Sequence, residues 1–177
     1  SVTTDDANAE SARGLDNPAR IREFESTGLE IEATASIDAF SFFGGLTWTD
    51  AEIVGANDPS VIGNTPRRQP DLIYTGTGAY TFEAGHNIGF SFFGRSDSFV
   101  GDDNSSDRKL DGYMTINMFA SYYLNDDLSV RLAVNNLTDE IGITEAEGFA
   151  WEVNGRSITS ARSILGRSTA LELRYQF

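Results

Sequence analysis

The sequence contains no cysteine, a single histidine, and only 13 Lys and Arg residues against 27 Asp and Glu. Without cysteine, neither a disulfide framework nor a thiolate metal site can form. The formal net charge of -14 disfavours nucleic acid as a partner, because a phosphate backbone requires a basic surface. The chain also lacks a run of about 18 apolar residues, which excludes a transmembrane helix. A membrane-spanning β-barrel remains compatible with this composition, since its strands are alternating segments of about 10 residues.

What the sequence does contain is strict alternation, and the final stretch shows it best. Thr169, Leu171, Leu173, Tyr175 and Phe177 fall on one face of a predicted strand, and polar residues occupy most of the opposite face. Chain ends usually tolerate polar residues. An aromatic residue at the end of the chain therefore requires an explanation.

Six earlier segments alternate in the same way. Their apolar rows, at every second residue, run from Thr27 to Ile37, Phe42 to Trp48, Leu72 to Phe82, Ile88 to Phe92, Met114 to Tyr122 and Leu128 to Val134. The charged residues of these segments fall on the opposite rows: Glu30, Glu32, Arg95, Arg131, Glu172 and Arg174. We expect these arginines to form ion pairs with the glutamates of other strands in the same sheet. A strand face that contacts lipid must be free of charged side chains.

The connections between these segments alternate in length. Short turns are predicted around Asp38, Glu83 to His86 and Asn125 to Asp127, and polar loops at about 55–70, 101–109 and 138–165. Outer-membrane barrels have short periplasmic turns and long extracellular loops, whereas a soluble sandwich, the alternative reading, has no reason for this regularity. The pattern predicts an all-β transmembrane antiparallel β-barrel fragment of about seven up-and-down strands. Because the first and last strands run in the same direction, they cannot close an even-numbered barrel, so further strands are required.

Motifs for catalysis are not found. In the stretch 89–94, GFSFFG, the serine lies inside a strand pattern and the glycine spacing differs from that of a nucleophile elbow. His86 falls in a short turn without a nucleophile beside it. Gly76 and Gly78 lack the third glycine of a dinucleotide motif, and we interpret them as small lipid-facing residues. No catalytic residue, cofactor or enzymatic activity is predicted.

An acidic run, Asp102, Asp103, Asn104 and Asp107, offers oxygen atoms that suit calcium. It lacks the central glycine and the closing glutamate of a helix-loop-helix calcium site. We interpret it as a solvated loop and predict no metal site.

Three internal motifs resemble those of TonB-dependent receptors. The stretch 132–140, LAVNNLTDE, resembles the V-x-N-L-x-D segment before the last strand of these receptors. The stretch 28–32, GLEIE, is similar to their G-x-E-x-E strand, and 63–70, GNTPRRQP, to their G-x-x-x-P-x-x-P return from an outer loop. The terminal residues Leu171, Leu173, Tyr175 and Phe177 look like the assembly signal that the barrel-assembly machinery reads in outer-membrane barrels.

This resemblance implies a location in the outer membrane of a Gram-negative bacterium, in contact with its lipid. It implies that residues 1–19 are an extracellular loop segment and that residues 20–177 are the last seven strands of a barrel of about 22 strands. The plug domain, the segment that contacts TonB and the earlier strands would lie outside this chain. No signal peptide is visible, so either it was removed or the chain starts within a longer one.

The implied function is TonB-dependent active uptake of a scarce nutrient: a siderophore, cobalamin or carbohydrate. The alternative is a structural or passive-pore barrel without TonB coupling, and a barrel hydrolase fails for lack of a histidine near a nucleophile. For ligand binding, Phe149, Trp151, Asn154 and Arg156 place aromatic and hydrogen-bonding groups in the last long loop, where rings can stack on a sugar or an aromatic chelator. In the alternative, Phe149 and Trp151 pack the loop on itself or lie near lipid headgroups.

Overall fold

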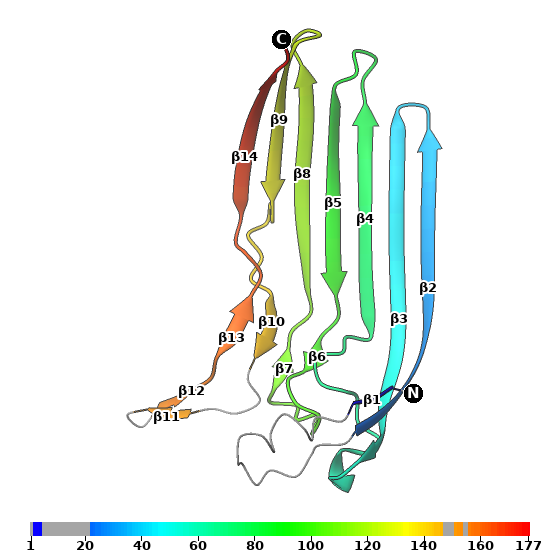
Figure 1. The fold of residues 1–177 in the computed structure, drawn as a ribbon, viewed down its shortest axis with the longest axis vertical. Helices are drawn as coiled ribbons and strands as arrows, with labels where there is room; N and C mark the ends of the chain where they lie inside the picture. Colours follow the sequence, from blue (N-terminus) through cyan, green and yellow to red (C-terminus); the bar gives the residue numbers. More distant parts are fainter. Residues whose placement is uncertain (1, 5–21, 147–150, 154–155) are drawn as a thin grey trace.

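The computed structural model describes residues 2–4, 22–146, 151–153 and 156–177. Their main sheet is antiparallel, and its strands are arranged in the order in which they occur along the chain. Seven long strands run side by side (Figure 1): β2 (Arg22–Ile37), β3 (Phe40–Ala56), β4 (Leu72–Thr81), β5 (Asn87–Arg95), β8 (Tyr113–Tyr123), β9 (Leu128–Asn135) and β14 (Ser168–Tyr175). The predicted up-and-down arrangement is confirmed. No helix among the described residues is long and apolar enough to span a membrane.

The amino-terminal segment includes residues that join the main sheet. Val2–Thr4 form a short strand, β1, that pairs with Arg22 to Phe24 at the start of β2. The assignment of residues 1–19 to an extracellular loop stays a prediction, and these three residues form a strand too short to show a period in the sequence. The remainder of that segment lies outside the described residues.

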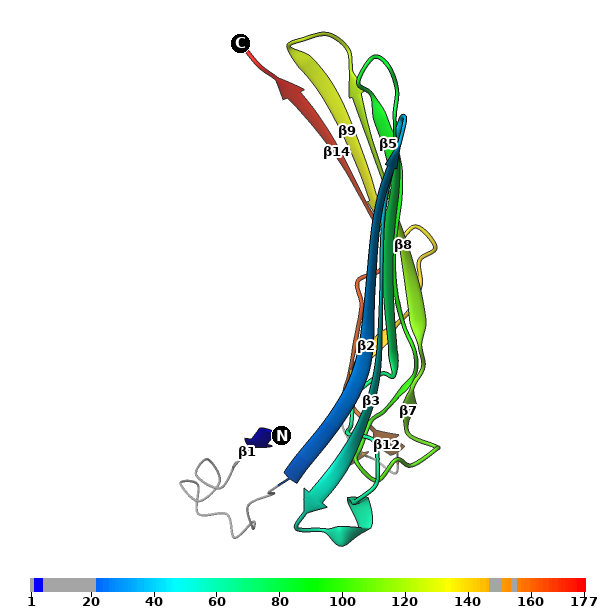
Figure 2. The ribbon, with the colours of Figure 1, turned by 90° about the vertical axis from the view of Figure 1, so that its right-hand side faces the viewer.

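The sheet is open and curved, as the side view in Figure 2 shows. In the described part of the chain, β14 pairs only with β9, and β2 beyond Phe24 pairs only with β3. Both outer strands therefore carry a free edge of unpaired backbone groups, which a membrane interior does not tolerate.

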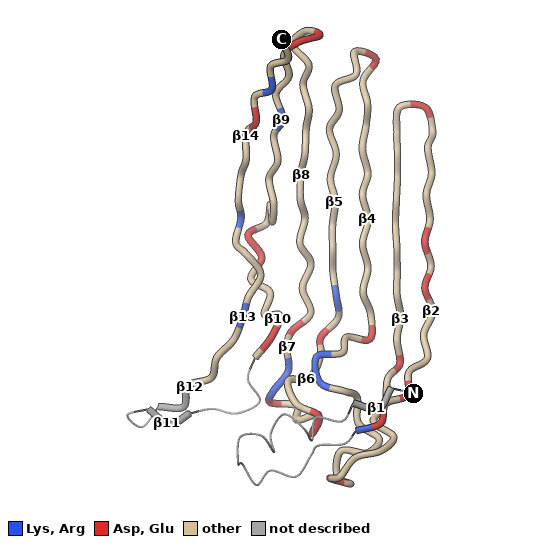
Figure 3. Tube along the Cα trace, viewed as in Figure 1, with Lys and Arg blue, Asp and Glu red and all other residues tan. Residues whose placement is uncertain are grey.

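The strand register places the predicted apolar rows on one face of the whole sheet. Leu29 lies opposite Trp48, and Trp48 opposite Leu72. At the other side, Met118 pairs with both Phe90 and Val134. Figure 3 shows that most charged residues lie toward the two ends of the strands. The apolar side chains remain exposed, with Leu29 at 55% and Leu171 at 73%, so this face requires an apolar medium or partner.

Glycines within the strands make room for aromatic rings on their neighbours. The ring of Phe92 lies over Gly76, where a Cβ atom would approach it to 2.5 Å, and the ring of Tyr74 covers Gly94 in the same way. Gly76 therefore lies on the apolar face, opposite Gly44 and Phe92, where the ring of Phe92 covers it. The reason is the cross-strand pairing, which brings each of these glycines opposite an aromatic residue.

Aromatic residues also gather at the short-turn end. The Tyr80 ring centroid lies 4.7 Å from those of both Phe40 and Phe82, and His86 stacks on Tyr122 at 4.1 Å. His86 is a turn residue, as predicted, and its Nδ1 accepts a hydrogen bond from the backbone N–H of Tyr123. This cluster has the composition of an interfacial aromatic girdle.

All three predicted short turns are confirmed. Asp38 adopts φ +51° in the two-residue turn from β2 to β3, and Gly85 adopts φ +83° in the turn from β4 to β5. In the third turn the Asn125 side chain accepts hydrogen bonds from the backbone N–H groups of Asp127 and Leu128.

The long loops contain more regular structure than the sequence indicates. The first, residues 57–71, holds a 3-10 helix, η1 (Pro59–Val61), and the second, 96–112, holds the pair β6 (Ser98–Phe99) and β7 (Lys109–Leu110). The third, 136–167, was predicted without strands but holds two ladders. They are β10 (Ile143–Ala146) with β13 (Ala161–Ser163), and β11 (Trp151–Val153) with β12 (Arg156–Ile158). Strands of three or four residues leave no clear alternation in a sequence.

Candidate ligand-binding region at the long-loop end

The three long loops lie together at one end of the sheet, opposite the short turns and Phe177 (Figure 1). This grouping follows from the antiparallel order, because every second connection emerges at the same end. The loops are joined to one another by polar contacts and a small apolar core. The long-loop end is therefore a connected structure.

A buried carboxylate joins the first and second loops. Asp102 is 7% exposed, and its carboxylate accepts a hydrogen bond of 2.8 Å from the backbone N–H of Arg67. The same carboxylate forms an ion pair of 2.5 Å with Arg22 on β2. In addition, Asn64 donates a hydrogen bond to the backbone carbonyl of Asp102. The interpretation of residues 102–107 as a solvated loop is wrong for Asp102, because Arg22 comes from a strand distant in sequence.

Asn104 strengthens this joint. Its side-chain amide donates to the carbonyl of Thr65 and accepts from the N–H of Thr65, both at 2.8 Å. The backbone of Asn104 has φ +49°, a left-handed conformation that Asn tolerates better than most residues. A single side chain thus replaces a pair of backbone hydrogen bonds between two loops.

Arg68 joins the first loop to the third. Its guanidinium forms an ion pair of 2.5 Å with Glu145 on β10 and donates to the carbonyl of Ala146. Arg162 on β13 approaches the same Glu145 carboxylate at 3.3 Å. The Nε atom of Arg68 is buried without a hydrogen-bond partner among the described residues. All three loops are therefore connected through Arg68 and Asp102.

Ion pairs gather at this end and not in the wall. Within residues 22–146 and 159–177, where side chains are described, every ion pair includes a long-loop residue. Arg131 lies opposite Glu172 in the strand register, yet no ion pair joins them. The expected pairing of arginines and glutamates across the wall is wrong. Arg95 instead donates to Ser98 and to the carbonyl of Ser96.

The remaining carboxylates of the acidic run are occupied by neighbours. Asp103 pairs with Arg108, and Asp107 accepts a hydrogen bond from Ser105 that lowers the pKa of its carboxyl. Nearby, a hydrogen bond from Lys109 lowers the pKa of Asp97. Among the described residues, no group of three or more His, Cys, Asp or Glu side chains is placed to hold a metal ion.

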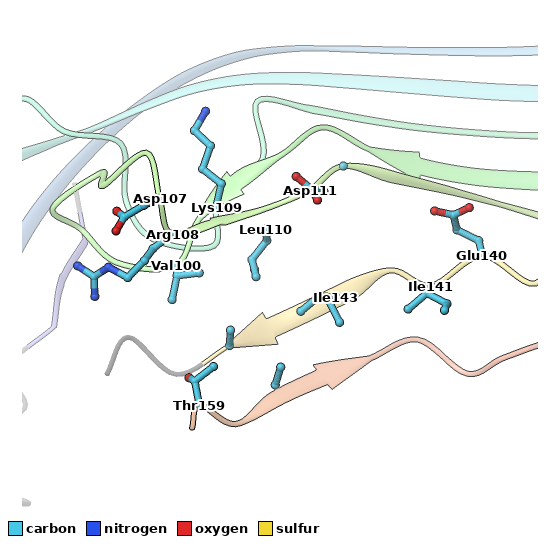
Figure 4. Close-up of a pocket in the computed structure, with 13 residues that line it drawn as sticks. Val100, Asp107, Arg108, Lys109, Leu110, Asp111, Glu140, Ile141, Ile143 and Thr159 are labelled. Atoms are coloured by element: carbon cyan, nitrogen blue, oxygen red, sulfur yellow. The ribbon is translucent and has the colours of Figure 1, made fainter. Parts of the chain in front are cut away.

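A cavity lies between the second and third loops (Figure 4). Val100, Leu110 and Ala146 form its buried apolar cluster, and Ile143 packs against them. The cavity has a volume of about 800 Å³, within the range of small-molecule sites. Sequence reasoning missed it because its walls come from two loops with no motif of their own.

The model of the family "TonB dependent receptor-like, beta-barrel" matches residues 3–137, which is more than half of the chain. The chain belongs to this family. No curated protein was found to match it. Members of this TonB-dependent receptor family are transport receptors of the outer membrane of Gram-negative bacteria.

Solved structures share the fold at low sequence identity. The siderophore receptor PiuA from Acinetobacter baumannii matches 88% of this chain with a TM-score of 0.73 and 20% identity. The ferric yersiniabactin uptake receptor FyuA from Yersinia pestis matches 88% with a TM-score of 0.71 and 17% identity. The chain spans 22% and 24% of the length of those two proteins. The likeness shows that the seven long strands share the fold of part of these receptor structures.

Of the four residues predicted to bind ligand, the structure describes the backbones of two. Phe149 and Asn154 are outside the described residues. Trp151 begins β11 and Arg156 begins β12, and their backbones belong to one short hairpin in which Val153 lies opposite Arg156. Ligand binding by this group stays a prediction.

The four residues of the predicted assembly signal are all exposed. Leu171, Leu173 and Tyr175 lie on the apolar face of β14 at 73%, 69% and 62% exposure. Phe177 follows the end of the strand, fully exposed, with its ring centroid 6.2 Å from that of Tyr175. Their position on an outer strand agrees with a role in assembly, which itself stays a prediction.

Proposed function

We propose that this chain forms the carboxy-terminal wall of an outer-membrane receptor that takes up a scarce nutrient by TonB-dependent transport. One observation carries the proposal: the register aligns the uncharged apolar rows of all seven long strands on one face, most of which is exposed, while the polar loops gather at one end. A wall of this kind separates lipid from a polar interior. Membership of the TonB-dependent receptor family supports TonB as the source of energy for this transport.

The wall requires partner strands to function. Its two outer strands, β2 and β14, point in the same direction (Figure 1), so an odd number of further antiparallel strands is needed to join them. We propose that residues 20–177 are the last seven strands of a barrel of about 22, and that residues 1–19 belong to an extracellular loop. The earlier strands and an amino-terminal plug that contacts TonB would complete the receptor.

For the nutrient, we propose a siderophore, cobalamin or carbohydrate, with ferric siderophores as the first class to test. Two similar structures are described as a siderophore receptor and a ferric citrate transporter, which supports iron chelates as the starting point. The long-loop end would capture the ligand, and Phe149, Trp151, Asn154 and Arg156 would contribute stacking and hydrogen bonds. The terminal residues Leu171 to Phe177 would serve the barrel-assembly machinery.

The test uses the complete receptor in its native outer membrane. Cells with and without the receptor gene are given labelled ferric siderophores, cobalamin and oligosaccharides, one at a time, in strains with and without TonB. We expect one nutrient to accumulate only when both the receptor and TonB are present. Accumulation that needs the receptor but not TonB would favour the passive-pore alternative, because diffusion through an open barrel requires no energy.

A further inference from the structure

The cavity between the second and third loops has an apolar floor and a charged mouth. Its floor is formed by Val100, Leu110, Ile143, Ala146 and Ala161. Figure 4 shows Val100 and Leu110 directed toward β10, whereas Lys109 points away from it. We call this space, between β7 and the β10–β13 ladder, the loop slot. Its floor excludes a simple hydrated ion as the main occupant, since such an ion leaves the apolar surface uncovered.

The cations at the mouth of the loop slot are already occupied. Lys109 forms an ion pair of 2.8 Å with Asp97, and its ammonium lies 4.7 Å from the ring centroid of Phe99. Arg108 is paired with Asp103. Neither cation is therefore available to an anionic ligand without breaking an existing pair.

Two carboxylates at the mouth have no such partner. Within the described part of the chain, the side chains of Asp111 and Glu140 form neither a hydrogen bond nor an ion pair. Both lie toward the end of the slot nearest the long strands, and Asp107 and Arg108 lie at the opposite end (Figure 4). The charge that the slot offers to a ligand is therefore negative, and the two carboxylates without a partner lie toward one end of the apolar space.

We propose that the loop slot binds an amphiphilic cation: a molecule with an apolar or aromatic body and an amine or guanidinium group. The body would cover the floor, and the cationic group would lie between Asp111 and Glu140. The volume of about 800 Å³ suits a small molecule of this kind. An anionic ligand would meet two uncompensated carboxylates, and the net charge of -14 opposes its approach as well. This inference rests on the proposed uptake function and names a chemical class for its ligand.

The experiment uses the complete receptor in lipid nanodiscs and a matched pair of fluorescent probes. Dansylcadaverine carries an aromatic body and an amine, and dansyl-6-aminohexanoic acid carries the same body and a carboxylate. Titrations are read as saturable dansyl fluorescence after subtraction of the signal from empty nanodiscs. The test variant is Asp111→Asn with Glu140→Gln. The control is Asp126→Asn with Asp127→Asn, which removes the same charge at the short-turn end.

We expect saturable binding of the cationic probe, and a Kd that rises about 3- to 10-fold in the test variant and stays unchanged in the control. The anionic probe should bind more weakly than the cationic one to the wild-type receptor. A second variant, Ala161→Trp, should weaken both probes by filling the slot. Heat-modifiable gel mobility verifies that each variant is folded.

Three results would overturn the proposal: equal binding of the two probes, an unchanged Kd in the test variant, or a signal that reflects partition into lipid only. Nutrient uptake by the same receptor is measured separately, in cells with and without TonB. Probe binding with the expected charge dependence, in a receptor that imports nothing with TonB, overturns the uptake function and leaves the loop slot standing. TonB-dependent import by a receptor whose slot variants bind the probe like wild type overturns the loop slot alone.

Discussion

An arginine placed on each face of β8 tests which face of the wall contacts lipid. Ile116 lies on the apolar face opposite Phe92, and its neighbour Thr115 lies on the other face opposite Phe93. The pair Ile116→Arg and Thr115→Arg therefore adds the same charge at nearly the same height on opposite sides of one strand. Asn117 is unsuitable as the control, because its side chain accepts a hydrogen bond from the backbone N–H of Asn136.

The structure sets the size of the expected effect. Met118 is the middle of the apolar row that runs from Met114 to Tyr122, and Ile116 is one position away in that row. Two residues of a tilted strand correspond to roughly 5 Å of depth, so Ile116 lies well within an apolar band about 25 Å tall. Arginine costs about 2 to 4 kcal/mol at the midplane and about 0 to 1 kcal/mol near an interface. We expect a loss of about 2 to 3 kcal/mol for Ile116→Arg and less than about 1 kcal/mol for Thr115→Arg.

The assay is equilibrium unfolding of the complete receptor in lipid vesicles, followed by tryptophan fluorescence, for which Trp48 provides a reporter in the wall. A difference of about 2 kcal/mol between the variants corresponds to roughly 30-fold in the folding equilibrium. Equal losses, or a larger loss for Thr115→Arg, would refute the assignment of the apolar face to lipid.

Three further predictions concern other parts of the chain. Deletion of Phe177 should lower the amount of inserted receptor far more than the ligand affinity per folded molecule; normal heat-modifiable levels would remove it from the assembly signal. Asp102→Ala leaves Arg22 unpaired and should cost about 3 kcal/mol of local stability, so limited proteolysis should cut the second loop while the wall resists; unchanged cleavage would contradict the joint. Gly76→Leu should lose about 1 to 3 kcal/mol of unfolding free energy against the ring of Phe92. Adding Phe92→Ala should recover part of that loss, and no recovery would exclude the steric cause.

The period of two was enough to predict the wall from sequence. The alternation from Thr169 to Phe177 and its six counterparts depends only on neighbouring residues, because side chains of a strand point alternately to its two faces. The short turns were equally readable, since Asp38 and Gly85 are residue types that accept positive φ. Lipid contact also leaves a mark in sequence, as it removes charges from every second position.

The contacts at the long-loop end depend on the tertiary structure and could not be predicted from the sequence. In the sequence Asp102 resembles a solvent-exposed aspartate, and only the folded sheet places Arg22 of β2 against it. Arg68 pairs with Glu145 because the first and third loops emerge at the same end of the sheet. The loop slot likewise requires Leu110 and Ile143 to meet across two loops. A strand's pattern is local and repeats, so sequence reveals it. Contacts between loops depend on strand order and on the path of each loop, and these are set only when the sheet is assembled.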